Sequence, residues 1–135
     1  MLPLRYPRTW LGIGYALTIG TFVVTLLPEL WPLDYEDKRW LMKSDKLIHG
    51  AIFFFLTIWF SGQYQRQYYV RLGAAMLFFG GFIEVCQSFT AYRTAELMDF
   101  VADAAGIGLG LLLALIGLGG WSLWIERKLA GRGGE

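Results

Sequence analysis

Ionisable and amide side chains interrupt the apolar runs of this chain at helical spacing. Glu84 lies inside the run 72–89, and Gln87 follows three positions later on the same helical face. Charged groups inside a membrane segment are costly and normally face a partner or a polar cavity, so each is a candidate functional residue. A carboxylate there can transfer a proton, pair with a cation or contact a ligand. The alternative is that Glu84 and Gln87 only link helices by hydrogen bonds.

Two further pairs of polar residues stand at the front of other apolar runs. Asp45 and His49 are four positions apart, as are Asp99 and Asp103, so the members of each pair share one helical face. Asp45 suits the positive end of a helix dipole, but a helix start does not explain His49, one turn further in. An imidazole at that depth is either hydrogen-bonded to a neighbouring helix or used for proton transfer or ligand contact.

Two basic residues stand close to these acids in the sequence. Lys46 follows Asp45 directly, and Arg93 stands between the runs that carry Glu84 and Asp99. Arg93 either pairs with one of the acids or presents its planar fork to a phosphate or carboxylate from outside. The candidate ligand-binding residues are therefore Asp45, Lys46, His49, Glu84, Gln87, Arg93, Asp99 and Asp103. The candidate catalytic residues are His49, Glu84 and Asp99.

One imidazole and several carboxylates form a set that is compatible with a divalent metal ion. The chain has no His-x-x-x-His motif, however, and its single cysteine, Cys86, lies in an apolar run. We therefore expect no metal and no cofactor. Ser44 and Ser88 have no evident partner that would activate them as nucleophiles, so the sequence leaves open whether the protein is an enzyme.

Composition indicates the class of protein that positions these residues. Hydrophobic residues make up 56% of the chain and charged residues 17%, and the mean hydropathy is +0.44. These values exceed ordinary soluble composition. About 20 apolar residues cross a bilayer. The sequence therefore predicts one all-α domain, residues 1–135, that forms an integral membrane bundle of four transmembrane helices at 9–27, 45–62, 72–91 and 97–124.

Charge indicates the orientation of this bundle. With four helices, both termini and the segment 63–71 share one side, which carries Arg5, Arg8, Arg66, Arg71, Arg127, Lys128 and Arg132. Basic residues that flank membrane spans tend to stay in the cytoplasm, so we predict cytoplasmic termini. The candidate site residues then lie toward the external leaflet, at depths a lipid headgroup can reach. The net charge of +1 excludes nucleic acid as a partner.

Small residues recur every four positions in the first and last predicted helices. They are Gly12, Ala16 and Gly20, and Ala102, Gly106 and Gly110. Such stripes are typical of closely packed membrane helices. The simplest interpretation is that the first helix packs against the fourth.

The motifs Asp45-Lys46-x-x-His49, Glu84-x-x-Gln87, Arg93 and Asp99-x-x-x-Asp103-x-x-Gly106-x-x-x-Gly110, in this order, resemble the VanZ-like family of bacterial membrane proteins. The resemblance covers residues 44–115, and it departs at Asp103, where the family often has Asn. It implies a multi-pass protein of the bacterial cytoplasmic (inner) membrane with a role in the cell envelope. The founding member is associated with low-level resistance to the glycopeptide teicoplanin.

We therefore expect an outward-facing polar pocket that binds a lipid headgroup or a lipid-linked cell-wall precursor. Membrane lipids are the expected partners, and the resemblance adds a glycopeptide and a link to antibiotic resistance. Two alternatives remain open. One is a membrane-embedded hydrolase or transferase that uses His49 with Glu84 or Asp99 as acid and base on an envelope lipid. The other is a structural or partner-assembly protein.

Overall fold

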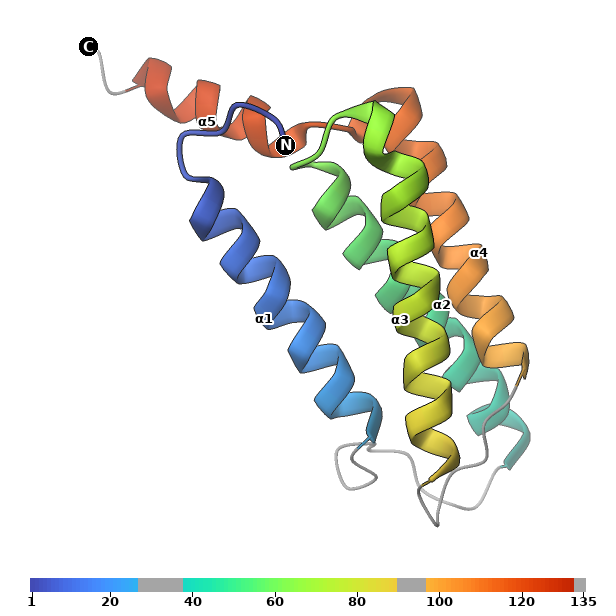
Figure 1. The fold of residues 1–135 in the computed structure, drawn as a ribbon. Helices are drawn as coiled ribbons and strands as arrows, with labels where there is room; N and C mark the ends of the chain where they lie inside the picture. The colour runs from blue at the N-terminus through green and yellow to red at the C-terminus, as the bar shows by residue number, and fades with distance from the viewer. Residues whose placement is uncertain (27–37, 90–96, 133–135) are drawn as a thin grey trace.

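The computed structural model describes residues 1–26, 38–89 and 97–132, with side chains from residue 46 onward in the second range and up to residue 131 in the third. The elements are α1 (Pro7–Leu26), α2 (Lys38–Ser61), the 3-10 turn η2 (Arg66–Tyr68), α3 (Tyr69–Ser88), α4 (Leu97–Leu113), the π-helical turn η3 (Ala114–Leu118) and α5 (Trp121–Arg132). Four long helices form the bundle, and α5 lies across one end of it (Figure 1). The all-α helical bundle is confirmed.

Among the described residues, three stretches are long and apolar enough to cross a membrane. They are Pro7–Leu26, Arg66–Ser88 and Leu97–Gly131, which takes in α4, η3 and α5. The apolar part of α2, Lys46–Ser61, is shorter. The whole of α2 has 24 residues. At about 1.5 Å per residue its 16-residue apolar part extends roughly 24 Å, less than a hydrocarbon core of about 30 Å.

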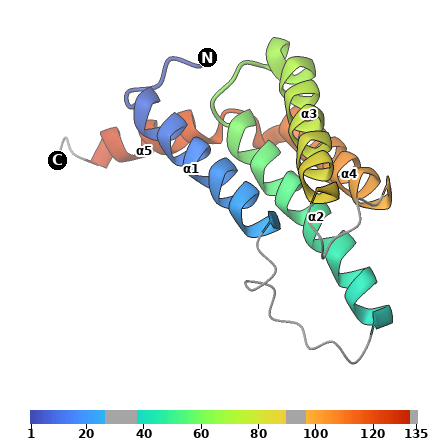
Figure 2. The ribbon, with the colours of Figure 1, turned by 60° about the horizontal axis from the view of Figure 1, so that its bottom comes forward.

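The closest helix contact joins α2 and α4, which run parallel to each other (Figures 1 and 2). A Cβ atom on Gly106 would overlap with the carbonyl oxygen of Gly50, so the two backbones touch. One turn further along, a Cβ on Gly110 would lie 2.9 Å from Cβ of Thr57. The small residues of α4 therefore allow a close approach, as small-residue stripes do in membrane helices.

The predicted packing of the first helix against the fourth is wrong. Gly12, Ala16 and Gly20 of α1 are exposed, and a Cβ added to either glycine would meet no atom within 4 Å. The buried small residue of α1 is Gly14, where a Cβ would lie 2.8 Å from the ring of Phe60 on α2. Helix α1 contacts α2 and α3 instead.

The core lies among α2, α3 and α4. Its buried members are Phe53, Leu56, Phe60, Leu72, Met76, Ile83 and Ile107. Large apolar side chains also cover the outside, among them Phe55, Phe78 and Ile116, which are 68%, 78% and 72% exposed. Soluble monomers rarely expose extensive apolar patches. The outer face of this bundle therefore suits lipid.

The predicted helix 97–124 is wrong as a continuous element. The α-helix ends at Leu113, the π-helical turn follows, and Gly119 and Gly120 separate it from α5. Gly120 has φ of 74°, a left-handed conformation that favours glycine. A Cβ on Gly119 would overlap with the Tyr69 hydroxyl group. The apolar run is uninterrupted in sequence, but these glycines turn the chain.

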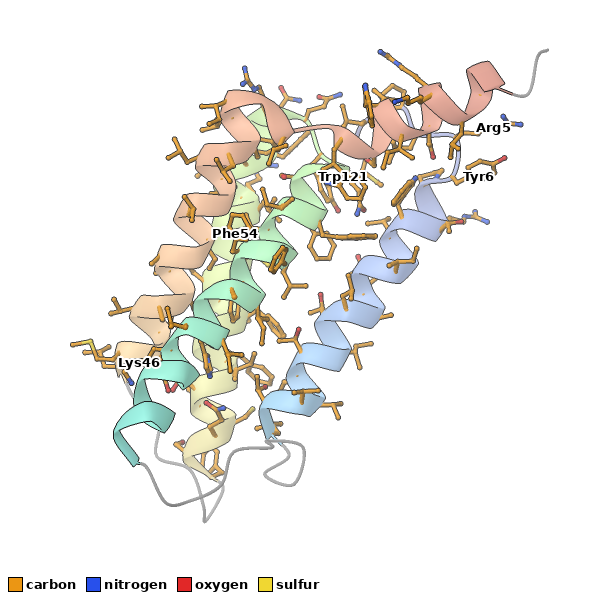
Figure 3. All side chains as sticks on the ribbon, turned by 180° about the vertical axis from the view of Figure 1, so that it is seen from behind. Arg5, Tyr6, Lys46, Phe54 and Trp121 are labelled. Carbon is orange, nitrogen blue, oxygen red and sulfur yellow. The ribbon has the colours of Figure 1, made fainter. Side chains whose placement is uncertain are left out.

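The amino-terminal segment lies at the end of the bundle where α5 crosses, as Arg5, Tyr6 and Trp121 show in Figure 3. Trp10 packs against Trp59 and Trp121, with ring centroids 5.7 and 5.3 Å away. Trp121 also donates a hydrogen bond from Nε1 to the Ile58 carbonyl oxygen over 2.9 Å. These indole groups join α1, α2 and α5 at what we call the terminal end.

Glu126 of α5 holds the amino-terminal segment at this end. Its carboxylate accepts hydrogen bonds from the backbone N–H groups of Arg5 and Tyr6, over 2.6 and 3.0 Å, and from Trp10 Nε1 over 2.8 Å. The side chain is buried. Hydrogen bonds to a charged acceptor are stronger than neutral ones. Sequence reasoning did not single out this residue, although it is an acid among the basic side chains of α5.

The substitution Glu126→Gln is expected to loosen the amino-terminal segment. The glutamine amide has one acceptor oxygen, and its NH₂ group would face an N–H donor from which the carboxylate now accepts a hydrogen bond. We expect this change to weaken the attachment of the amino-terminal segment to α5 by about 1–3 kcal/mol. Hydrogen exchange at the amides of Arg5 and Tyr6 should accelerate. The matched control is Arg127→Gln, at an exposed neighbouring position. Equal exchange rates in the two variants would contradict the assigned role of Glu126.

Candidate functional site

The candidate site residues that the structure describes come from three helices at the end opposite the termini. Lys46 and His49 lie on α2, Glu84 and Gln87 on α3, and Asp99 and Asp103 on α4. Figure 3 shows Lys46 at the end far from Arg5 and Tyr6. The side chain of Asp45 and the whole of Arg93 lie outside the described residues, so their predicted roles stay predictions.

The innermost contact joins His49 and Asp103. Nδ1 of the imidazole lies 3.2 Å from Oδ1 of the carboxylate. The side chains are 1% and 0% exposed. The pairing follows from the parallel α2 and α4, because Gly50 stands next to His49 and Gly106 stands nearly one turn after Asp103. The same backbone contact that joins the helices therefore positions this pair.

A second pair lies one turn closer to the end of the bundle. Lys46 donates a hydrogen bond from Nζ to Oδ1 of Asp99 over 3.1 Å. The Lys46 side chain is 29% exposed and that of Asp99 only 7%. Asp99 precedes Asp103 by four positions, and the two share one face of α4 as their spacing predicts. Lys46 precedes His49 by three positions and shares a face of α2 with it, whereas the sequence prediction paired Asp45 with His49. The two pairs form an inner and an outer layer.

Glu84 joins the inner pair from the third helix. One potential ligand atom of each of His49, Glu84 and Asp103 lies within 4.8 Å of the other two. All three residues are buried, with Glu84 the most exposed at 8%. We call these residues the His49–Glu84–Asp103 cluster. A neutral imidazole, or an imidazolium, thus meets two carboxyl groups away from water.

Gln87 does not belong to this cluster. Its Nε2 atom donates a hydrogen bond over 3.0 Å to the carbonyl oxygen of Thr25, near the end of α1. This bond joins α3 to α1, which is the linking role that amide side chains often have in membrane bundles. Glu84 and Gln87, predicted to act together from their spacing, therefore contact different helices.

The arrangement has two chemical capacities. The hydrogen bond to Asp103 orients the His49 ring, as a carboxylate does for a general-base imidazole. The partly exposed Lys46 offers a positive charge near the surface of the bundle. The three side chains of the cluster are buried in the part of the chain that the structure describes. One cavity of about 340 Å³ lies elsewhere, lined by Tyr15, Tyr64 and Arg71 among others.

Comparison with known proteins shows what this chain is similar to. The chain is 35% identical over 102 residues to "Uncharacterized protein C11E3.10" of the fission yeast Schizosaccharomyces pombe. The match covers 73% of this chain and 62% of that protein, so the chain spans less than two thirds of its relative's length. No protein-family model matches the chain, and no solved structure matches it.

Proposed function

We propose that this multi-pass helical membrane protein binds the phosphate-bearing headgroup of an anionic membrane lipid or lipid-linked wall precursor, one with net negative charge, at its polar end. The observation that carries the proposal is the convergence of Lys46, His49, Glu84, Asp99 and Asp103 from three helices. Ionisable groups in membrane segments normally mark sites of function. The exposed part of Lys46 lies where a phosphate can reach it, and its partner Asp99 holds the ammonium group in place.

The resemblance to VanZ-like proteins supports an envelope role in the bacterial cytoplasmic membrane. The basic residues of the terminal end support cytoplasmic termini. The lipid site then faces the external leaflet, where both phospholipids and polyprenyl-linked precursors are present. Arg93 follows α3 in sequence and is the second basic residue we assign to the headgroup.

Substitution Lys46→Met is expected to weaken retention of anionic lipid about fivefold, because one basic residue near the membrane surface contributes about 1 kcal/mol. Asp99 then loses its partner and adds repulsion. The measurement is native mass spectrometry of the full chain with phosphatidylglycerol, a polyprenyl phosphate and zwitterionic phosphatidylcholine. Preference between the first two identifies the source of the phosphate.

Lys128→Met is the matched control, since it is the same change on α5, where the ammonium lies 4.6 Å from the Trp124 ring. It should leave most of the specific retention intact. If the two variants lose lipid equally, or if zwitterionic phosphatidylcholine is retained as well as the two anionic lipids, the proposed site is wrong.

A second function is favoured by the oriented imidazole. His49, held by Asp103, has the arrangement of a general base, and Glu84 is close enough to serve as the acid. An enzyme would convert an envelope lipid into a chemically different product. Recovery of a changed lipid after incubation with the protein separates this function from binding, in which the lipid is recovered intact.

A further inference from the structure

The His49–Glu84–Asp103 cluster has the composition of a metal site. It offers one imidazole nitrogen and two carboxylate oxygens from three different helices, all within 4.8 Å of one another. Imidazole and carboxylate are ligands that Zn²⁺ and related divalent ions accept. Residues from separate helices can enclose an ion on several sides, whereas carboxylates along one helix face cannot.

Asp103 supplies a second and independent observation. The residue is 0% exposed, and among the described residues its Oδ2 atom accepts no hydrogen bond. A Cβ atom built on Gly80 of α3 would lie 2.8 Å from Oδ2, so this oxygen faces α3. Glu84 stands one turn further along α3. A buried carboxylate oxygen without a hydrogen bond is costly, and it points toward the helix that carries the second carboxylate.

The chemistry of the three side chains suits a cation. As ligands of an ion, Glu84 and Asp103 would bind through ionised carboxylates and His49 through its neutral imidazole, in a site that is buried from water. A divalent ion would cancel both charges at once and satisfy Oδ2. We propose that His49, Glu84 and Asp103 bind a divalent transition-metal ion, with Zn²⁺ as the probe.

The distances require only a small adjustment. Zinc binds nitrogen and oxygen ligands at about 2.0–2.2 Å, so two ligands of one ion lie roughly 3–3.5 Å apart. The ligand atoms lie within 4.8 Å of one another, so on binding an ion they would approach by up to about 1.5 Å. Three protein ligands leave a fourth position for water or another ligand. The metal site does not rest on the proposed lipid binding, because the ion needs only these three side chains.

The test is Zn²⁺ binding to the purified full chain in detergent, without a polyhistidine tag, by competition with a chromophoric chelator. Wild type should bind one ion saturably and gain thermal stability. Asp103→Asn and Glu84→Gln remove one ligand charge each at nearly constant shape, and each should weaken binding by about a hundredfold or more. Mn²⁺ should bind more weakly than Zn²⁺.

Asp99→Asn is the matched control, because it makes the same change on α4 one turn outside the cluster. It should bind Zn²⁺ like wild type. Absence of saturable binding, or equal affinity in Asp103→Asn, Glu84→Gln and the control, overturns the site. If either Asp103→Asn or Glu84→Gln does not fold, the Zn²⁺ affinity of the other variant decides whether the site exists. Zn²⁺ binding in lipid-free micelles is independent of the lipid measurements, so failure of lipid binding leaves this result standing.

Discussion

Gly106→Ala is expected to lower the free energy of unfolding by about 3 kcal/mol, at the upper end of what one extra methyl group costs in a packed core. The added Cβ would overlap with the carbonyl oxygen of Gly50, which is backbone and cannot rotate away. Helices α2 and α4 must therefore separate along their closest contact. The measurement is SDS-induced unfolding in mixed micelles, followed by tryptophan fluorescence.

Function should fall with stability in this variant, for a geometric reason. Gly50 is the neighbour of His49, and Gly106 follows Asp103 by three positions, so separation of the backbones lengthens the 3.2 Å contact between imidazole and carboxylate. Lipid retention and Zn²⁺ affinity are both expected to drop.

Gly108→Ala is the control on the same helix. A Cβ at Gly108 meets nothing within 4 Å. Alanine also favours the helical backbone over glycine. This variant should unfold at wild-type SDS concentration or slightly above it. Equal loss in Gly106→Ala and Gly108→Ala would mean that the contact between Gly50 and Gly106 does not hold the bundle together.

The helices themselves could be predicted because a segment that spans a membrane can adopt few backbone structures. Backbone groups in lipid must find partners within the segment, so long apolar runs become helices. α3 runs Tyr69–Ser88 where 72–91 was predicted, and α1 runs Pro7–Leu26 where 9–27 was predicted. The turn at Gly119 and Gly120 was missed, because hydropathy does not register a change of direction within an apolar run.

Helix pairing could not be predicted from the small-residue stripes. The spacing of Gly106 and Gly110 shows that α4 has a face for close approach, but not which helix approaches it. The stripe of Gly12, Ala16 and Gly20 has the same spacing and faces outward. The partner of Gly106 is Gly50, which follows the buried His49 on α2. Because α2 and α4 run parallel, these two glycines meet and allow the close contact. Nothing in one sequence identifies that partner.

The site was predictable where it depends on a single helix. Spacing put Asp99 and Asp103 on one face of α4, and each meets a residue of α2 in the same register. Spacing also put Glu84 and Gln87 on one face of α3, but that face borders α1 as well as α2 and α4. Glu84 meets the cluster, whereas Gln87 meets the Thr25 carbonyl of α1. The Glu126 contacts depend on the turn before α5, and were missed with it.

His49→Ala is expected to be the most damaging substitution at the site, with a loss of about 3 kcal/mol of stability. Oδ1 of Asp103 loses its imidazole contact, and the other carboxylate oxygen already accepts no hydrogen bond among the described residues. The vacated volume lies at a fully buried position. SDS-induced unfolding of wild type and variant measures the loss.

His49→Asn separates the structural role of this residue from its chemical role. The asparagine amide nitrogen occupies nearly the place of Nδ1 and can donate to Asp103, so about 1 kcal/mol of stability or less is lost. The second ring nitrogen, the titratable proton and the imidazole ligand are gone. If His49 transfers protons or binds a metal ion, lipid turnover or Zn²⁺ binding disappears while the bundle remains folded. If the polar residues only hold the helices together, lipid retention should follow stability in both variants. His49→Asn should then retain nearly all of its stability and lipid, and His49→Ala should lose both.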